Sequence, residues 1–246
     1  MQPVINHPWQ VSIQEAKAIQ LQLAKEVIHE KFSGKIIKIC AVDVSYGRFD
    51  SAGYGVLGWF AVTDDSSGKQ FDCQTIKIFT TISSVAFPYV PGYLSFREIP
   101  VLLSLFQKLP EKPDLVLVDG AGVAHPRGIG LAAHLGVIFD IPTIGCAKSR
   151  LFGNYAEPAN ESGAVSALTN EGDIIGYVLR TKKNTRPLFI SPGHRTDPQS
   201  SLAIIQRFCG KYRIPEPLRT VDLISKELRR NPDRLPNNMN MMSCNS

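Results

Sequence analysis

The stretch DLVLVDGAGVAHPRGIGLAAHLGVIFDIPTIGCAKS, residues 114–149, has the pattern of a strand, a helix and a second strand in that order. Residues 114–120 form an apolar run that ends in an acid, residues 129–140 have the pattern of a helix, and residues 141–149 read as a second buried strand. Successive strands with a helix between them imply a parallel crossover. The stretch therefore predicts an α/β fold whose sheet is parallel at this point.

The residues before this unit predict a different strand arrangement. Residues 35–47, 53–65 and 71–83 are rich in β-branched and aromatic side chains and are separated by turn-forming residues, which favours an antiparallel meander. Residues 12–31 have the apolar spacing of an amphipathic helix, with Ser12 and Glu15 at the spacing of a capping box. The expected sheet is therefore mixed, with the meander joined to parallel strands.

The remaining elements are predicted from the same patterns. Residues 101–110 read as a helix with Pro100 near its first turn. Residues 172–181 and 187–193 read as a hairpin, and residues 197–210 and 219–230 as two helices.

His134 lies on an apolar helix and is expected to be a core histidine. Residues 231–246 lack periodicity and are expected to form a flexible tail. No repeat or linker divides the chain, so we expect one domain over residues 1–246.

Composition narrows the class of protein. The chain has 246 residues, of which 43% are hydrophobic, and its net charge of +5 is compatible with a phosphate-bearing partner without requiring one. Its five cysteines are widely spaced and include no CxxC pair, which argues against a disulfide framework or a zinc site. The sequence shows no signal-peptide pattern and no apolar run of membrane-spanning length. We expect a cytoplasmic protein with no membrane partner.

Two acids stand at strand ends. Asp43 lies in the apolar run of residues 35–47, and Asp119 ends the run of residues 114–120. Each alone could bond turn amides or cap a helix. If their strands are neighbours, however, the two carboxylates repel by several kcal/mol at an effective dielectric constant of about 20, and a divalent cation removes that repulsion. Oxygen ligands suit Mg²⁺, and Mn²⁺ is expected to substitute for it.

Two further acids could complete such a site. Glu98 is expected at the entrance to a helix, and Asp222 lies early in the last helix. At either position, an acid could instead make a favourable contact with the helix dipole.

The segment PYVPGYLSFREIP, residues 88–100, places Tyr89 between two prolines. Pro88 fixes its own backbone angle φ, and Pro91 restricts Val90 to extended geometry, so the tyrosine ring is held on a stiff backbone. One interpretation is a turn whose tyrosine covers the core. The other is a rigid ring that enters a base stack.

Five segments together resemble the endonuclease V family of deoxyinosine-directed repair nucleases, which have a ribonuclease H-like fold. They are AVDVSYG, PYVPGYLSFREIP, the long run of residues 115–153, PLFISPGHRTD and RIPEPLRTVD, and they occur in the order in which the family has them. The resemblance implies a Mg²⁺-dependent nuclease that cuts the second phosphodiester 3′ to a deaminated base. The products would carry 3′-hydroxyl and 5′-phosphate ends.

The resemblance also implies roles for individual residues. The catalytic positions would be Asp43, Glu98, Asp119, Asp222 and Lys148, with Asp43 and Asp119 as metal ligands. The DNA wedge would be Pro88, Tyr89, Val90 and Pro91, the lesion pocket Gly92, Leu94, Gly120 and Gly122, and the phosphate contacts Arg97, His125 and Lys148. Arg97 either binds phosphate or supports Glu98. Arg127 is another basic residue expected to meet phosphates, whereas Arg150 and Arg195 are expected on the solvated surface.

Other functions use similar residues. The alternatives are an inosine-directed ribonuclease or a resolvase-like nuclease of the same fold. A resolvase or a ribonuclease that uses the same acids should lack the wedge. A nucleic-acid-binding protein without activity would keep basic loops and lack the carboxylates. The expected partner is therefore DNA that contains deaminated bases, with inosine-containing RNA as the alternative and a monomer as the working form.

Overall fold

A computed structural model describes residues 1–47 and 51–233. The predicted tail lies outside the described residues from position 234 onward. Every helix within the described ranges is too short or too polar to cross a membrane.

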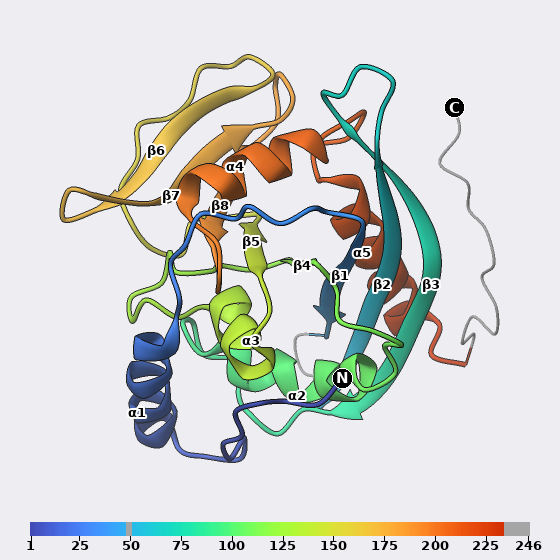
Figure 1. Ribbon diagram of the computed structural model, residues 1–246. Coiled ribbons are helices and arrows are strands. Elements are labelled where there is room, and N and C mark those ends of the chain that lie inside the picture. Colours follow the sequence, from blue (N-terminus) through green and yellow to red (C-terminus); the bar gives the residue numbers. More distant parts are fainter. Residues whose placement is uncertain (48–50, 234–246) are drawn as a thin grey trace.

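The strands of the described residues form one mixed sheet in the order β3-β2-β1-β4-β5-β8-β7-β6 (Figure 1). The neighbours β1–β4 and β4–β5 are parallel, and all other neighbours are antiparallel. The predicted α/β class, the meander and the parallel crossover are therefore confirmed. The strands are β1 (Lys38–Ser45), β2 (Ala52–Asp64), β3 (Phe71–Ser84), β4 (Leu115–Val118), β5 (Thr143–Ala147), β6 (Ala164–Asn170), β7 (Asp173–Arg180) and β8 (Leu188–Pro192).

Helices cover both faces of the sheet. One apolar cluster joins β1 and β4 to α2 (Leu94–Phe106) and α3 (Leu131–Phe139), and His134 of α3 is fully buried, as expected. A second cluster joins the opposite side chains of β1 and β4 to α4 (Pro198–Arg207) and α5 (Glu216–Arg230). Because successive strand side chains alternate between faces, Asp43 follows Ile39 and Ala41 toward the α5 face.

The N-terminal helix is shorter than predicted. α1 (Ile13–Leu23) begins with the expected Ser12–Glu15 capping box, and one 3₁₀ turn, η1 (Ala24–Glu26), follows it. The predicted continuation to residue 31 is wrong. The Ile28 amide donates to Nδ1 of His194 at 3.2 Å, and the Ile28 carbonyl accepts from the Arg195 amide at 2.8 Å. These contacts with the loop after β8 hold the segment extended.

The helix α2 begins earlier than predicted. It starts at Leu94 rather than near residue 101, so Pro100 lies inside the helix and not in its first turn. The early start follows a tight turn in which the Tyr93 amide donates to the Val90 carbonyl at 3.0 Å. Glu98 consequently lies in the second turn of α2, and the prediction of a helix entrance at this position is wrong.

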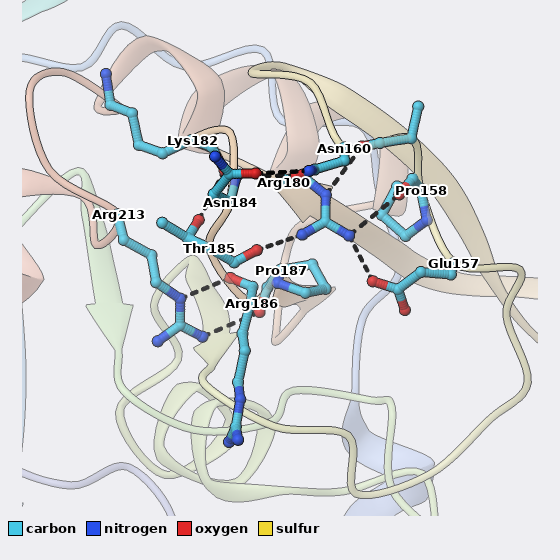
Figure 2. A network of polar contacts seen from close by, with 11 residues as sticks. Glu157, Pro158, Asn160, Arg180, Lys182, Asn184, Thr185, Arg186, Pro187 and Arg213 are labelled. Atoms are coloured by element: carbon cyan, nitrogen blue, oxygen red, sulfur yellow. Dashed lines mark hydrogen bonds and ion pairs between the residues drawn. The ribbon is translucent and has the colours of Figure 1, made fainter.

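The strand β6 was not predicted, and it extends the hairpin of β7 and β8 at one end of the sheet. Figure 2 shows two arginines, Arg180 and Arg213, that hydrogen-bond the loops next to these strands. The Arg180 guanidinium donates to the carbonyls of Ala159, Pro158 and Thr185 and to Glu157. Arg213 donates to the carbonyls of Arg186 and Pro187 at 2.7 and 3.0 Å (Figure 2). The same guanidinium donates to the Lys148 carbonyl at 3.1 Å, so it ties this loop to the end of β5.

Candidate active site

Three carboxylates meet beside the C-terminal half of β1 and the end of β4. Val42 pairs with Val118 in the parallel ladder, so Asp43 and Asp119 are the next residues on adjacent strands. Asp222 reaches the same point from α5. One oxygen of each of the three carboxylates lies within 4.8 Å of the others. The structure thus brings together the two predicted metal ligands and one predicted catalytic residue.

Asp43 lies in an environment that disfavours its charge. Burial, followed by the nearby Asp119 carboxylate, raises the pKa of Asp43 to about 7. The Ser225 hydroxyl donates to Asp43 Oδ2 and acts in the opposite direction. The protein therefore compensates only part of the repulsion between the Asp43 and Asp119 carboxylates, and a bound cation would compensate the rest.

Two lysines surround Asp222. Lys148 Nζ lies 2.5 Å from Asp222 Oδ1, and Lys226 Nζ lies 2.7 Å from Oδ2. Burial would raise the pKa of Asp222, but the bonds and charges of these lysines outweigh it and lower that pKa. Lys148 also pairs with Asp119. Burial would lower the pKa of Lys148, yet the two carboxylates raise it, so the ammonium stays charged at neutral pH.

Glu98 completes the group from the other face of the sheet. Glu98 lines a pocket together with the other four predicted catalytic residues, Asp43, Asp119, Asp222 and Lys148. Burial and then the charges of Asp43 and Asp119 raise the pKa of Glu98.

The sequence did not single out Tyr46, Ser225 or Lys226. The Tyr46 hydroxyl hydrogen-bonds Glu98, and its ring packs 4.5 Å from the Arg97 guanidinium. Ser225 and Lys226 lie three and four residues after Asp222 on α5, so helical spacing could have found them. For Tyr46 we find no comparable signal.

The carboxylate group fits a hard divalent cation. All its ligand atoms are oxygens from a converging set of acids, and burial together with the repulsion from Asp119 raises the pKa of Asp43. Such a donor set is the kind that Mg²⁺ and Mn²⁺ prefer.

The proline-flanked segment forms the wall of a second pocket. Tyr89 is 64% exposed, which excludes the interpretation that its ring covers the core. The pocket is lined by Tyr89, Val90, Pro91, Gly92, Leu94, Gly120 and Ala121, and also by Asp119 and Lys148 of the carboxylate site. The two pockets therefore adjoin.

Gly122, predicted for the lesion pocket, is not among the described residues that line this second pocket. A Cβ atom at this position would lie 1.9 Å from the carbonyl oxygen of Pro192. Close packing of the loop against β8 thus explains this glycine.

Two of the three predicted phosphate contacts, Arg97 and His125, are engaged inside the protein, whereas Lys148 lines both pockets. Arg97 is 8% exposed and donates to the Phe87 carbonyl at 2.8 Å. His125 Nε2 donates to the Gly92 carbonyl at 2.9 Å, and its Nδ1 accepts from the Arg127 amide at 3.2 Å. Burial lowers the pKa of His125 to about 4, so the ring is neutral at pH 7. Phosphate binding by Arg97 or His125 stays a prediction that would require these bonds to be exchanged.

The two arginines expected on the surface differ in how exposed they are. Arg150 is exposed, as expected, and donates to the Gly153 carbonyl at 3.2 Å. Arg195 is partly covered and pairs with Asp140 and Glu30 at 2.7 and 3.2 Å.

Comparisons with known proteins agree with this geometry. The family model for endonuclease V matches residues 21–223. The endonuclease V of Kosmotoga olearia is 43% identical over 230 residues, which cover 92% of this chain and 96% of that protein. The structure of the Streptomyces avermitilis endonuclease V has a TM-score of 0.80 at 34% identity and covers 93% of this chain and 98% of that chain. A Ciona intestinalis endonuclease V, in complex with a 24mer DNA containing an inosine followed by a ribo-adenosine, has a TM-score of 0.71 at 26% identity and covers 89% and 98% of the two chains. The carboxylate site, the adjoining pocket and these matches lead to one conclusion: the chain is a nuclease and belongs to the endonuclease V family.

Proposed function

We propose that this nuclease recognises deaminated bases, chiefly inosine, in DNA and cuts the second phosphodiester 3′ to the lesion with Mg²⁺. One observation carries the proposal: Asp119 and Lys148 line both pockets. The first is the wedge pocket, whose wall contains Tyr89, Val90 and Pro91, and the second is the carboxylate pocket, which contains the acids. A base held in the first pocket would place a nearby phosphodiester of the same strand at the second. The complex of the Ciona relative with inosine-containing DNA supports the choice of lesion.

Recognition would use the wedge of Pro88, Tyr89, Val90 and Pro91. Extruding a nucleotide costs a few kcal/mol, and stacking a base on an aromatic ring returns about 1–3 kcal/mol. The ring of Tyr89 therefore roughly balances the extrusion, and the pocket must supply the discrimination. Hypoxanthine lacks the exocyclic amine of guanine, so a tight wall containing Gly92, Leu94 and Gly120 would accept it and exclude guanine.

Cleavage would take place at the carboxylate group. Asp43, Asp119 and Asp222 would hold the cation, and when bound it would supply positive charge for the leaving oxygen and the attacking water. Lys148 carries its charge between the two pockets, and we propose that it contacts the scissile phosphate. Glu98, desolvated and held by Tyr46, is proposed to orient the water as a general base.

A second candidate is an inosine-directed ribonuclease. The predicted lesion-pocket features, Gly92, Leu94 and Gly120, give no reason to prefer one sugar over the other, and the Ciona relative was crystallised with a ribo-adenosine after the inosine. Cys40, Cys146 and Cys209 are free thiols, which supports our proposal of a reducing, cytoplasmic compartment. We propose a monomer as the working form.

The test compares matched duplexes that differ only in one inosine and in sugar type. With Mg²⁺, we expect one nick at the second phosphodiester 3′ to inosine in DNA, mapped on a sequencing gel, and none with EDTA. Equal cutting of undamaged DNA would refute the lesion specificity. Faster cutting of the RNA duplex would favour the second candidate.

A further inference from the structure

Three side-chain donors converge on a single backbone oxygen, the carbonyl of Gly92. Gln20 Nε2 donates to it at 3.1 Å and His125 Nε2 at 2.9 Å, and the Arg127 guanidinium makes a third, shorter contact. Gln20 comes from α1, whereas His125 and Arg127 come from the loop after β4. Two parts of the chain that are distant in sequence thus hold the same atom.

The three donors also hold one another. Arg127 Nε donates to Gln20 Oε1 at 2.6 Å, and the Arg127 amide donates to His125 Nδ1 at 3.2 Å. The Arg127 guanidinium lies 4.2 Å from the ring centroid of Tyr93. Gln20 and His125 are only 1% and 2% exposed, so water does not compete for these bonds. We call Gln20, His125 and Arg127 the Gly92 lock.

Gly92 occupies the controlling position of the wedge turn. The Tyr93 amide donates to the Val90 carbonyl at 3.0 Å, Pro91 is the second residue of the turn, and Gly92 has φ of 81°. This is the signature of a type II turn, in which the third residue needs a positive φ. A rotation of the Gly92 carbonyl would therefore change the backbone of the turn and, with it, the positions of Tyr89 and Pro91.

The Gly92 carbonyl accepts from more donors than it needs to be fully hydrogen-bonded. A carbonyl oxygen has two lone pairs, so two donors would already satisfy it. A third donor, itself fixed by the other two, adds restraint on orientation. Tyr89 is largely exposed, and its ring lies 6.2 Å from the ring of Tyr46, measured between centroids, so the backbone turn contributes to its position.

We propose that the Gly92 lock positions the wedge and the wall of the lesion pocket before DNA binds, and so determines how strongly a deaminated base is preferred over a normal one. The proposal rests on the proposed function, because it concerns the same pocket. Gln20 and His125 also line the pocket, but their polar groups and the Arg127 guanidinium are bonded to the turn and to one another. We therefore assign the three residues a positioning role, in place of the phosphate contacts expected for His125 and Arg127. Tyr89, Leu94 and Gly120 would contact the DNA. A flexible wedge must be ordered on binding, which lowers affinity without changing the chemistry at the carboxylates.

The experiment uses two lock variants and a matched control. Gln20→Met removes both bonds of the Gln20 amide and keeps the chain length, and Arg127→Lys keeps the charge but loses the forked geometry. Gln14→Met makes the same substitution at an exposed position of the same helix. Each protein is measured for melting temperature, for Kd on inosine-containing and undamaged duplexes, and for single-turnover cleavage at saturating enzyme.

We expect the Kd for the inosine duplex to rise about tenfold in Gln20→Met, with the Kd for undamaged duplex unchanged. The saturating cleavage rate should stay within about twofold of wild type, because the carboxylate site is untouched. Arg127→Lys keeps the positive charge that a phosphate contact would use, so it should lose affinity for the inosine duplex in the same way, and it serves as the test should Gln20→Met fold poorly. Gln14→Met should behave as wild type.

A double variant, Gln20→Met with Arg127→Lys, tests whether the residues act as one unit. We expect its loss of affinity to be close to that of the weaker-binding single variant rather than the product of both. Unchanged preference for inosine in both single variants, a loss confined to the cleavage rate, or fully multiplicative losses would overturn the lock. Wild-type protein without preference for inosine would instead refute the proposed function, so the two failures are distinguishable.

Discussion

Asp43 combines a proposed functional role with a cost to stability. Its carboxylate is partly buried beside Asp119, and burial and that neighbour raise its pKa to about 7. Asp43→Asn should abolish Mg²⁺-dependent nicking. In metal-free buffer above pH 7 it should also stabilise the fold by about 1 kcal/mol or more, because a buried charge is removed while the amide oxygen still accepts from Ser225. Activity assays and urea unfolding in EDTA check both effects. Normal nicking, or a clear loss of stability, would contradict the assignment.

Tyr46 offers a prediction about the pH dependence of the reaction. Its hydroxyl bonds to Glu98 and lowers the pKa of that carboxyl, against burial and the neighbouring acids, which raise it. Tyr46→Phe removes this bond alone, so the pKa of Glu98 should rise further. If Glu98 acts as a base, the acid limb of the rate profile should move to higher pH, and the rate at neutral pH should fall by up to about tenfold. A profile that superimposes on that of wild type would remove Glu98 from this role.

The residues of the site differ in how far sequence could identify them. Asp43 and Asp119 were predictable, because an acid at the end of an apolar strand needs a reason that local structure seldom provides. Gln20 was not, because its partners Gly92 and Arg127 are more than 70 residues away and only the tertiary fold brings them together. Helical spacing predicts neighbours on one helix and carries no information about such contacts.

At the scale of elements, the connection between β4 and α3 depends on close approach to β8. Gly122 packs against the Pro192 carbonyl, and an added Cβ would lie 1.9 Å from that oxygen. Gly122→Ala should therefore destabilise the protein by about 2 kcal/mol or more. Gly210→Ala is the matched control, because no heavy atom lies within 4 Å of its Cβ position. Thermal unfolding of both variants measures the difference, and equal melting temperatures would show that the loop simply shifts.

Element boundaries were less predictable than the elements themselves. The pattern of β4, α3 and β5 identified the parallel crossover, since strand and helix periods are properties of local sequence. The start of α2 was misplaced by several residues, because Pro100 is a strong signal for a first turn and the wedge turn that really precedes the helix is fixed from outside by the Gly92 lock. The boundary of α1 was likewise determined by the tertiary contacts of Ile28.

At the scale of the whole molecule, the site is assembled from both layers of helices around the sheet. Glu98 comes from α2 on one face, Asp222 comes from α5 on the other, and the β1–β4 strand ends lie between them. A cation bound by the three carboxylates would therefore connect α5 to the two central strands. Ligand binding to the folded state alone raises stability, so Mg²⁺ should raise the melting temperature.

The size of this stabilisation should depend on pH in a defined direction. The pKa of Asp43 is raised in the metal-free fold, so protons compete with the cation most strongly below about pH 7. The increase in melting temperature with saturating Mg²⁺ should be largest near pH 8 and small at pH 5. Above pH 7, Asp43 is ionised in the metal-free protein and repels Asp119, and Mg²⁺ would remove this repulsion. Below pH 7, protonation of Asp43 already relieves the repulsion, so Mg²⁺ has less to remove. Asp43→Asn should show little Mg²⁺ stabilisation at either pH, and a wild-type increase that is as large at pH 5 as at pH 8 would place the cation elsewhere.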